Sequence, residues 1–349
     1  MTRNDAWFSK NRLRAAVLIL AAATLVCLAA YMASPTITAD STPSYLTFTF
    51  LDIGQGDSIL VRASDGSAML VDGGPRSAGP TLVGRLRQLG VERIDTLVST
   101  HPHEDHIGGL IAVVNAIPIG RVIDSGKVHT SATYEQYLLA IEAKRVPFML
   151  GRQGTDFALG PATVSILWPG SRLPDDLNDC SIVLRVQFGR SSALLPGDTG
   201  SYVENALLEA GALSRTTLLK VSHHGSRTSN TLQMLRVTAP RVAVVQCAKD
   251  NPYNHPHRET LARLILGQAL IYRTDSEGEI SVTLTPSERS FSTRLARLGA
   301  GYRGSSASSV FHIPECAWAG KIHEDQLVVF SSRAQAVDAG YSPCSHCKP

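Results

Sequence analysis

The densest group of metal-ligand side chains lies in the segment THPHEDHIGGL, residues 100–110. Its histidines and aspartate form the pattern H-x-H-x-D-H, which begins at His101 and ends at His106. Imidazole and carboxylate groups bind zinc, manganese or iron, and residues two apart on an extended segment point to the same side. His101 and His103 can therefore bind one metal ion, and Asp105 and His106 can bind a second.

Two later segments add metal-ligand side chains at the ends of apolar runs. SSALLPGD, residues 191–198, ends in Asp198, and TLLKVSHHGS, residues 217–226, carries His223 and His224. A single aspartate after a strand is usually a turn or capping residue, and adjacent histidines are often only surface residues. Together with H-x-H-x-D-H, however, they make three ligand sets at matching strand ends, which favours one shared metal site.

The segments that carry these ligands belong to an alternation of strands and helices between residues 45 and 284. Asp65-Gly66 between two apolar runs predicts an early β-hairpin. The order predicts an α/β fold, a sandwich of two mixed sheets with helices outside. The patterns predict strands within 45–53, 57–64, 67–74, 94–100, 161–169, 180–189, 191–198, 217–226, 241–248 and 278–284, and helices within 80–90, 133–145, 201–211 and 258–267.

Further segments of this sequence resemble, in order, the soluble hydrolase domain of ComEC-type DNA-uptake proteins. That domain is a branch of the metallo-β-lactamase fold superfamily of dinuclear metallohydrolases. The resemblance covers about residues 45–286 and implies the αββα sandwich of that superfamily. The matching segments are FLDIGQGDSILV (50–61), LVDGG (70–74), NDCSIVL (178–184), LLPGD (194–198), LKVSHHGS (219–226), NHPHRETLARL (254–264) and YRTDSEGEI (272–280).

The resemblance also implies a centre of two divalent metal ions, zinc or manganese. The H-x-H pair would bind one ion and the D-H pair the other, while the strand-terminal aspartate would bridge them. One of the two adjacent histidines would complete the set. The implied ligands are His101, His103, Asp105, His106, Asp198 and His223, with His224 as the alternative to His223.

One departure from the superfamily pattern concerns a further histidine that many members carry between the first motif and the bridging aspartate. Here the only histidine in that interval is His129, in a segment that matches no motif. Asn178 and Asp179 occupy the corresponding place, as in the DNA-uptake branch, and are possible metal ligands. Four polar residues of the early hairpins have either turn roles or places beside the metals: Asp52, Gln55, Asp57 and Asp72.

A pair of metal ions about 3.5–4 Å apart can hold a bridging hydroxide, lower the pKa of water and neutralise the charge of a phosphoryl group. Hydrolysis through that hydroxide is the chemistry such a site supports. We expect Asp105, His224 and His255 to be catalytic. His255, in YNHPHRE, can donate a hydrogen bond to the substrate or protonate its leaving group. A structural role for His255 is the alternative, and His257 is a less favoured donor.

The C-terminal residues 309–349 contain a second ligand set, with the spacing H-x3-C and C-x2-C. It consists of His312, Cys316, Cys344 and Cys347. Four such ligands in a segment too small for its own core favour one structural zinc ion, because a closed Cys3His site contributes folding energy directly. A disulfide with one cysteine left over is the alternative, and His323 and His346 are alternate ligands. The segment resembles the small metal-binding module of the Ada DNA-repair protein.

An uncharged apolar run over residues 15–33 follows four basic residues, Arg3, Lys10, Arg12 and Arg14. The run is just long enough for about 30 Å of hydrocarbon and predicts an uncleaved membrane anchor whose basic end stays in the cytoplasm. A cleaved signal peptide, which would leave the protein secreted, is the alternative. In both cases the catalytic domain is expected outside the cytoplasm.

The predicted organisation has five parts. They are a membrane anchor or signal (1–34), a linker (35–44), a metallo-β-lactamase-like hydrolase domain (45–286), a second linker (287–308) rich in Ser, Arg and Gly, and an Ada-like zinc-binding module (309–349).

Composition is compatible with several functions. The chain has 349 residues, 44% of them hydrophobic, which is enough to bury a full core, and its formal net charge of +3 tolerates a polyanionic substrate. We expect a metal-dependent phosphodiesterase or nuclease that acts on DNA. One alternative keeps the fold and changes the substrate to a cell-wall phosphodiester polymer, a lactone or a thioester. The other is a non-enzymatic DNA- or envelope-binding protein. The sequence does not fix the oligomeric state.

Overall fold

The computed structural model describes residues 44–287, 291–296, 302–313, 316–323, 326–330, 336–337 and 339–347. The expected anchor over residues 1–34 lies outside the described residues, as does the linker after it up to residue 43. Within the described ranges, every helix is too short or too polar to cross a membrane.

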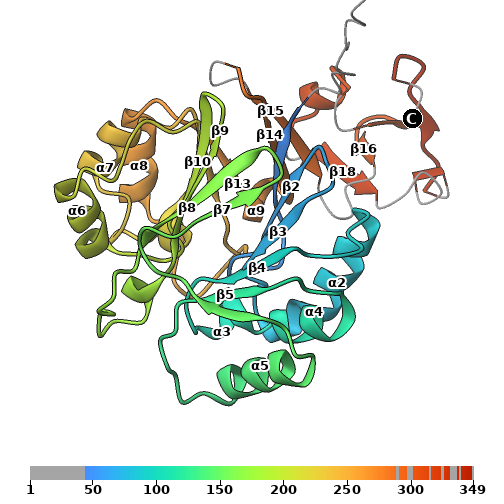
Figure 1. The fold of residues 1–349 in the computed structure, drawn as a ribbon. Coiled ribbons are helices and arrows are strands. Elements are labelled where there is room, and N and C mark those ends of the chain that lie inside the picture. Colours follow the sequence, from blue (N-terminus) through green and yellow to red (C-terminus); the bar gives the residue numbers. More distant parts are fainter. Residues whose placement is uncertain are drawn as a thin grey trace, which may run out of the picture. The chain divides into compact units, whose positions relative to one another are not determined.

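The first sheet is a mixed sheet of eight strands in the order β15-β14-β1-β2-β3-β4-β5-β6 (Figure 1). Strands from β15 to β3 pair antiparallel, and strands from β3 to β6 pair parallel. The strands are β1 (Leu46–Phe50), β2 (Ile59–Ala63), β3 (Ala68–Val71), β4 (Thr96–Ser99), β5 (Val122–Asp124), β6 (Phe148–Leu150), β14 (Glu279–Leu284) and β15 (Phe291–Ala296).

The second sheet has seven strands in the order β13-β12-β11-β10-β9-β8-β7. It too is mixed, because β7 to β10 pair antiparallel and β10 to β13 pair parallel. The strands are β7 (Asp156–Leu159), β8 (Ala162–Trp168), β9 (Val183–Phe188), β10 (Ser191–Leu195), β11 (Leu218–Lys220), β12 (Val242–Val245) and β13 (Leu270–Arg273).

The main core lies between the two sheets, where alternate residues of both sheets interlock. Phe48 and Phe50 of β1 share this core with Val164 and Ile166 of β8. Two further apolar clusters lie on the outer faces of the sheets. Figure 1 shows the helices on the outside of the two sheets. The structure therefore confirms the predicted α/β sandwich of two mixed sheets with outer helices. The helices are α2 (Gly79–Gln88), α3 (Glu104–Ile107), α4 (Leu110–Ala116) and α5 (Ala132–Ala143) on the first sheet, and α6 (Ser201–Glu209), α7 (Leu232–Thr238) and α8 (Arg258–Leu266) on the second.

The parallel pairs bring the polar segments that follow them to one edge of the sandwich. In the first sheet β3 pairs with β4, so the residues after Val71 and Ser99 emerge side by side. In the second sheet β10 pairs with β11, so the residues after Leu195 and Lys220 do the same. Since parallel strands end at the same edge, four loops meet there.

Glycines allow these loops to approach one another at backbone distance. A Cβ atom on Gly56 would lie 2.1 Å from the carbonyl oxygen of Asp105, and Gly56 also has a φ of 127°. A Cβ atom on Gly109 would lie 2.0 Å from the carbonyl oxygen of Gly73. Only glycine fits at both positions, and the backbone N–H of Asp57 donates to Asp105 O at 3.2 Å.

A third sheet belongs to the C-terminal part of the chain and has the order β18-β16-β17-β19. Phe311, Phe330 and Ala336 form its small apolar cluster. Its strands are β16 (Tyr302–Ser305), β17 (Val310–His312), β18 (Leu327–Phe330) and β19 (Ser342–Pro343).

The segment 287–308, expected to be a linker, contains two strands. β15 pairs antiparallel with β14 along six residues, and β16 belongs to the third sheet. The sequence FSTRLA of β15 has three polar residues in a row between apolar ends, so it carries no period-two pattern that could have predicted a strand. The boundaries of the five predicted parts otherwise stay predictions.

Several short elements were not predicted. β5, β6, β7 and β13 have three or four residues each, which is too short for a periodic pattern to be recognised. Helix α7 was missed as well, although Thr231 caps it by accepting a hydrogen bond from the backbone N–H of Met234.

Candidate metal centre

The loops at this edge bring together five of the expected ligands. Asp198 Oδ2 lies 3.2 Å from His106 Nε2 and 3.1 Å from His224 Nε2, and His224 Nε2 lies 3.4 Å from Asp105 Oδ2. The ring of His101 packs against the ring of His106, with their centroids 4.1 Å apart. Donor atoms of His101, His106 and Asp198 form one group within metal-binding reach, and those of Asp105, His106 and His224 form another.

Buried partners orient two of these imidazole rings. Asp72 Oδ2 accepts a hydrogen bond from His106 Nδ1 at 2.8 Å, and the carbonyl oxygen of Gln246 accepts one from His224 Nδ1 at 3.0 Å. Thr100 donates to both oxygens of the Asp72 carboxylate, so this carboxylate is itself fixed. Because Nδ1 is engaged on both rings, Nε2 is the atom that each presents to the centre.

Of the two adjacent histidines, His224 is the one that belongs to the cluster formed with His101, Asp105, His106 and Asp198. Both have left-handed backbone conformations, with φ of 52° for His223 and 53° for His224. His224 is buried. His223 lies outside the cluster and lines a pocket of about 290 Å³ next to it, with its ring centroid 5.6 Å from that of His255. Among the described residues, His224 belongs to the groups of donor atoms within metal-binding reach, whereas His223 and His103 do not, so the ligand roles of His223 and His103 stay predictions.

The other half of the site contains His101, His103 and Asn178. His101 Nε2 and His103 Nδ1 are 3.0 Å apart, and His101 Nδ1 lies 3.2 Å from Ser181 Oγ. Asn178 lines the same pocket, and its Oδ1 is buried without a hydrogen-bond partner. Asp179, the other possible ligand, is engaged elsewhere, since its Oδ1 accepts a hydrogen bond from the backbone N–H of Gly200 at 2.8 Å.

Charges in this cluster are strongly coupled. Burial alone would lower the pKa of His106, but the carboxylates of Asp198 and Asp105 raise it well above its ordinary value. Burial alone would raise the pKa of Asp198, but the charges on His224 and His106 hold it well below its ordinary value. The buried carboxylates therefore require positive charge beside them, which either protons on the imidazoles or divalent cations can supply.

The ligand atoms of this cluster are arranged for binding a metal ion rather than for hydrogen bonds to one another. His224 Nε2 is buried and makes no hydrogen bond, although Asp198 Oδ2 is only 3.1 Å away. When this imidazole is neutral, Nδ1 carries the proton and Nε2 directs a lone pair toward Asp198 Oδ2, which is the arrangement expected of two ligands of one cation. The set of imidazole and carboxylate donors is one that zinc, manganese or iron accepts.

The polar residues of the early hairpins divide into three groups. Asp57 and Asp72 are buried in the cluster, where Asp57 Oδ1 lies 3.4 Å from His224 Nδ1. Gln55 lines the pocket and accepts a hydrogen bond from the backbone N–H of Ala248 at 3.2 Å. Asp52 is not brought to the cluster and lies with Arg85 and Glu279 instead.

Lys220 is a member of the cluster that the sequence did not suggest. It is the last residue of β11, its exposed fraction is zero, and its ammonium group forms a close ion pair with Asp57. Burial alone would lower its pKa, but the carboxylates of Asp57 and Asp198 raise it, so the lysine stays charged. The signal available in the sequence was a lysine within the apolar run LLKV, where a charge needs a buried partner.

A pocket of about 290 Å³ opens above the cluster, and His255 forms part of its wall. Tyr253 stacks on the His255 ring with centroids 5.6 Å apart. Burial, and then the charges on His224 and His223, lower the pKa of His255 to about 4, so this imidazole is neutral at neutral pH. The His257 side chain is hydrogen-bonded to the backbone, because its Nδ1 accepts a hydrogen bond from the N–H of Arg227 at 3.2 Å.

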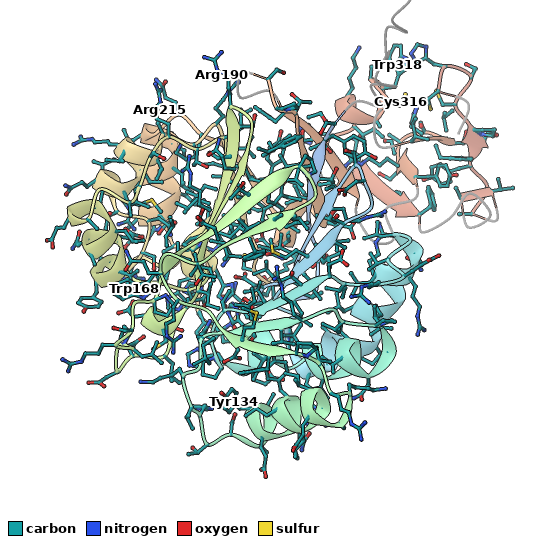
Figure 2. The ribbon with its side chains drawn as sticks, viewed as in Figure 1. Tyr134, Trp168, Arg190, Arg215, Cys316 and Trp318 are labelled. Atoms are coloured by element: carbon teal, nitrogen blue, oxygen red, sulfur yellow. The ribbon has the colours of Figure 1, made fainter. Side chains whose placement is uncertain are left out.

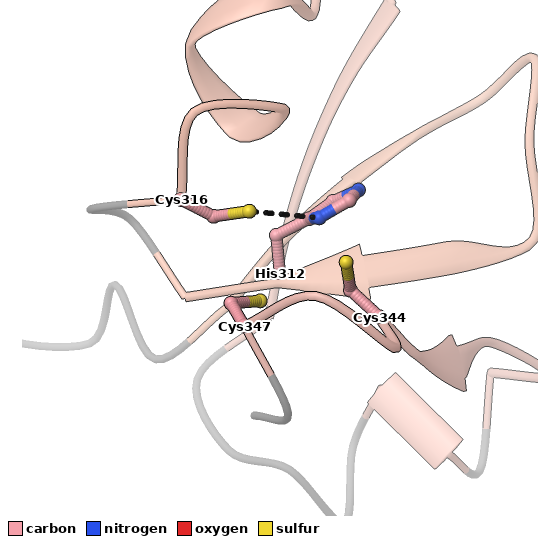
Figure 3. A group of neighbouring side chains, drawn as sticks. All are labelled: His312, Cys316, Cys344 and Cys347. Carbon is pink, nitrogen blue, oxygen red and sulfur yellow. Dashed lines mark hydrogen bonds between the residues drawn. The ribbon is translucent and has the colours of Figure 1, made fainter.

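The second ligand set is assembled at the C-terminal sheet (Figure 3). All four donor atoms lie within 4.8 Å of one another, and Cys316 Sγ is 3.4 Å from His312 Nδ1. Cys316, Cys344 and Cys347 are free thiols in this structure. His323 and His346, the alternate ligands, are exposed and do not belong to the group.

Comparison with known proteins identifies the fold family. The sequence pattern of the metallo-beta-lactamase superfamily matches residues 51–249. The chain belongs to this superfamily. Its αββα sandwich is thus the metallo-β-lactamase fold. The superfamily with this fold is one of metal-dependent hydrolases.

Similar curated proteins include a ComE operon protein, a competence protein and a recombination protein. ComE operon protein 3 of Bacillus subtilis is 28% identical over 66% of this chain, and competence protein ComA of Neisseria gonorrhoeae is 30% identical over 68%. Recombination protein 2 of Haemophilus influenzae is 27% identical over 66%. The matches span 32%, 32% and 28% of those proteins, so the chain covers about a third of their length. The resemblance to the ComEC-like branch is confirmed.

The two adjacent histidines give a direct test of the ligand assignment. Substitution His224→Ala should weaken the binding of one of the two divalent ions. Loss of a residue that only orients a metal ligand typically weakens metal binding about 10–100-fold, and loss of the ligand itself should weaken it more. His223→Ala should leave both ions bound, because His223 lies outside the cluster. Metal content of the two purified variants after dialysis against Mn²⁺ measures the difference. Equal metal loss in both variants would contradict the assignment.

Proposed function

We propose that this chain is a metal-dependent phosphodiesterase that hydrolyses DNA outside the cytoplasm. The observation that carries the proposal is the single oxygen of Asp198 shared by His106 and His224 at the floor of a pocket. The competence proteins to which the chain is similar favour DNA as the substrate. The apolar run over residues 15–33 and its basic flank favour export and a membrane anchor.

Each side chain of the cluster has a distinct task in this proposal. His101 and His103 would hold one divalent ion, Asp105, His106 and His224 would hold the other, and Asp198 would contribute to both. When bound, such a pair of ions lowers the pKa of water and neutralises charge on an attacked phosphoryl group. Asp72 and Gln246 keep the imidazole rings in their orientations through the hydrogen bonds to Nδ1.

His255 faces the pocket as a neutral imidazole. Its Nδ1 is buried without a hydrogen-bond partner, and the ring forms part of the pocket wall. A neutral imidazole can donate one hydrogen bond and accept another. We assign His255 the role of orienting the substrate, through a hydrogen bond to a phosphoryl oxygen or to the leaving oxygen. The low pKa argues against a stored proton on this ring at neutral pH.

Two further hollows leave room for a polymer. His255 also lines a hollow of about 640 Å³ that contains Lys249 and Arg273 together with Asp250 and Asp275, and Arg273 is paired with Asp275. Asp179, next to Asn178 in the sequence, lines a hollow of about 570 Å³ together with Trp168, Tyr202, Arg172 and the acidic Asp175 and Asp176. Trp168 (labelled in Figure 2) and Tyr202 meet edge to face, with centroids 6.4 Å apart. Aromatic faces and basic side chains are what flexible single-stranded nucleic acids bind to.

The tail cluster is proposed to hold one structural zinc ion. Three thiols and an imidazole within 4.8 Å match the tetrahedral Cys3His sites that zinc closes. Because the apolar cluster of the C-terminal sheet is small, the ion would contribute much of the stability of this sheet.

Substitution Cys344→Ser should remove one zinc ion per chain and lower the melting temperature of the C-terminal sheet, because a tetrahedral site loses a ligand. Mn²⁺ bound at the hydrolase cluster should be unchanged. Zinc content by atomic emission, together with limited proteolysis after residue 302, measures both effects. A Cys344→Ser variant that keeps its zinc would exclude the proposed zinc site. A disulfide among these cysteines in the wild-type protein would exclude it as well.

Substitutions His103→Ala and Asp198→Ala, each alone, should lower the rate of DNA hydrolysis at least about 100-fold, because each removes a metal ligand. The assay offers the full-length protein single-stranded DNA, duplex DNA, a small aromatic phosphodiester, a cell-wall phosphodiester polymer and a lactone, each with Mn²⁺ or Zn²⁺.

Controls for this assay are His323→Ala and Asp156→Ala, which change exposed residues outside the cluster and should retain wild-type rates. Cleavage of the wall polymer or the lactone without cleavage of DNA would replace the proposed substrate. DNA binding with no hydrolysis of any substrate would favour a binding protein.

A further inference from the structure

Lys220 is bound by acceptors on every side. Its Nζ atom forms a close ion pair with Asp57 Oδ2, lies 3.2 Å from the carbonyl oxygen of Gly197, and lies 3.4 Å from Asp198 Oδ1. A lysine ammonium has three N–H groups, so each can be assigned one acceptor. The side chain has no exposed surface, and it therefore has no freedom to reach other partners.

The two oxygens of the Asp198 carboxylate have different surroundings. Oδ1 faces Lys220, whereas Oδ2 faces His106 Nε2 and His224 Nε2. The backbone N–H of Asp198 donates to Ser181 Oγ at 3.1 Å, which fixes the main chain of this residue. Rotation of the carboxylate would exchange the oxygens, and the contact with Lys220 opposes that rotation.

Asp57 fixes Lys220 in turn, because its own backbone is held at both ends. Its N–H donates to Asp105 O at 3.2 Å, and its carbonyl oxygen accepts from the N–H of Gly74 at 2.8 Å. Gly56 permits this close approach, since any Cβ there would overlap the Asp105 carbonyl oxygen. The backbone of the first motif is thus connected to the Asp198 carboxylate through Asp57 and Lys220.

The geometry points to Lys220 as a positioning residue of the metal centre. By holding Asp198 Oδ1, it would leave Oδ2 as the oxygen offered to the metal ions, and its charge would oppose binding of an ion through both oxygens. The inference rests on the metal site of the proposed function. The competing explanation is an ion pair that serves only to neutralise buried Asp57.

A comparison of a single variant with a double variant separates these explanations. Asp57→Asn alone keeps Lys220 in contact with Asp198 and Gly197. Asp57→Asn with Lys220→Met removes both charges of the pair and leaves Asp198 Oδ1 without its partner. Removing both charges avoids the unpaired buried carboxylate that Lys220→Met alone would leave.

The measurement is Mn²⁺ binding to the metal-free full-length protein, with electron paramagnetic resonance of the bound ions. Mn²⁺ suits the imidazole and carboxylate cluster and not the thiol-rich tail, so tail binding does not interfere. Two ions that share one oxygen give an exchange-coupled spectrum. We expect this spectrum in the wild-type protein, and Asp57→Asn, which keeps the contact between Lys220 and Asp198, is the reference for the double variant. The double variant should bind the second ion about 10–100-fold more weakly than Asp57→Asn and lose the coupled spectrum.

A matched control is Arg85→Met with Glu279→Gln, which neutralises another ion pair with a buried carboxylate, one that does not belong to the cluster. It should bind Mn²⁺ as the wild type does. If the double variant at the cluster does not fold by circular dichroism, Lys220→Gln in the Asp57→Asn background gives a second neutral pair judged by the same comparison.

The outcomes distinguish the two levels of the account. A double variant that matches Asp57→Asn in both affinity and spectrum overturns the role of Lys220 while the proposed function stands. A wild-type protein that shows no coupled pair overturns the metal site itself, and the positioning role with it.

Discussion

Compensation of buried charge at one edge of the sandwich is the constraint on which the rest of the structure depends. Asp57, Asp72 and Asp198 are almost completely buried, and isolated carboxylates in such surroundings are strongly unfavourable. Lys220 and the imidazoles of His106 and His224 balance them without metal. Divalent ions would balance them more completely, because they would also occupy His224 Nε2, which has no hydrogen bond in this structure.

The fold meets this constraint by joining two sheets at their parallel halves. β3 and β4 deliver Asp72 and the H-x-H-x-D-H loop, and β10 and β11 deliver Asp198 and His224. Glycines at positions 56 and 109 let the loops touch at backbone distance, which brings side chains from distant parts of the sequence within hydrogen-bond reach. The same convergence places His255 and Tyr253 above the cluster and forms the pocket.

The sequence predicted the sheets, the outer helices and most of the candidate ligands, because ligand spacing at strand ends and apolar periodicity are local signals. It did not predict Lys220, since its partners Asp57 and Asp198 are distant in sequence and become neighbours only in the folded chain. It could not choose between His223 and His224, because the left-handed backbone at both residues decides which ring turns inward. It did not predict β15, because FSTRLA lacks an alternation of apolar and polar residues.

The most direct test of the central claim is the anomalous X-ray scattering of crystals of this protein grown with Mn²⁺ and measured at the manganese absorption edge. The account predicts two peaks, one within bonding distance of His101 and His103 and the other of Asp105, His106 and His224, with Asp198 Oδ2 bonded to both. An absence of peaks at this edge of the sandwich, or one ion bound by both oxygens of Asp198 without the imidazoles, would contradict it.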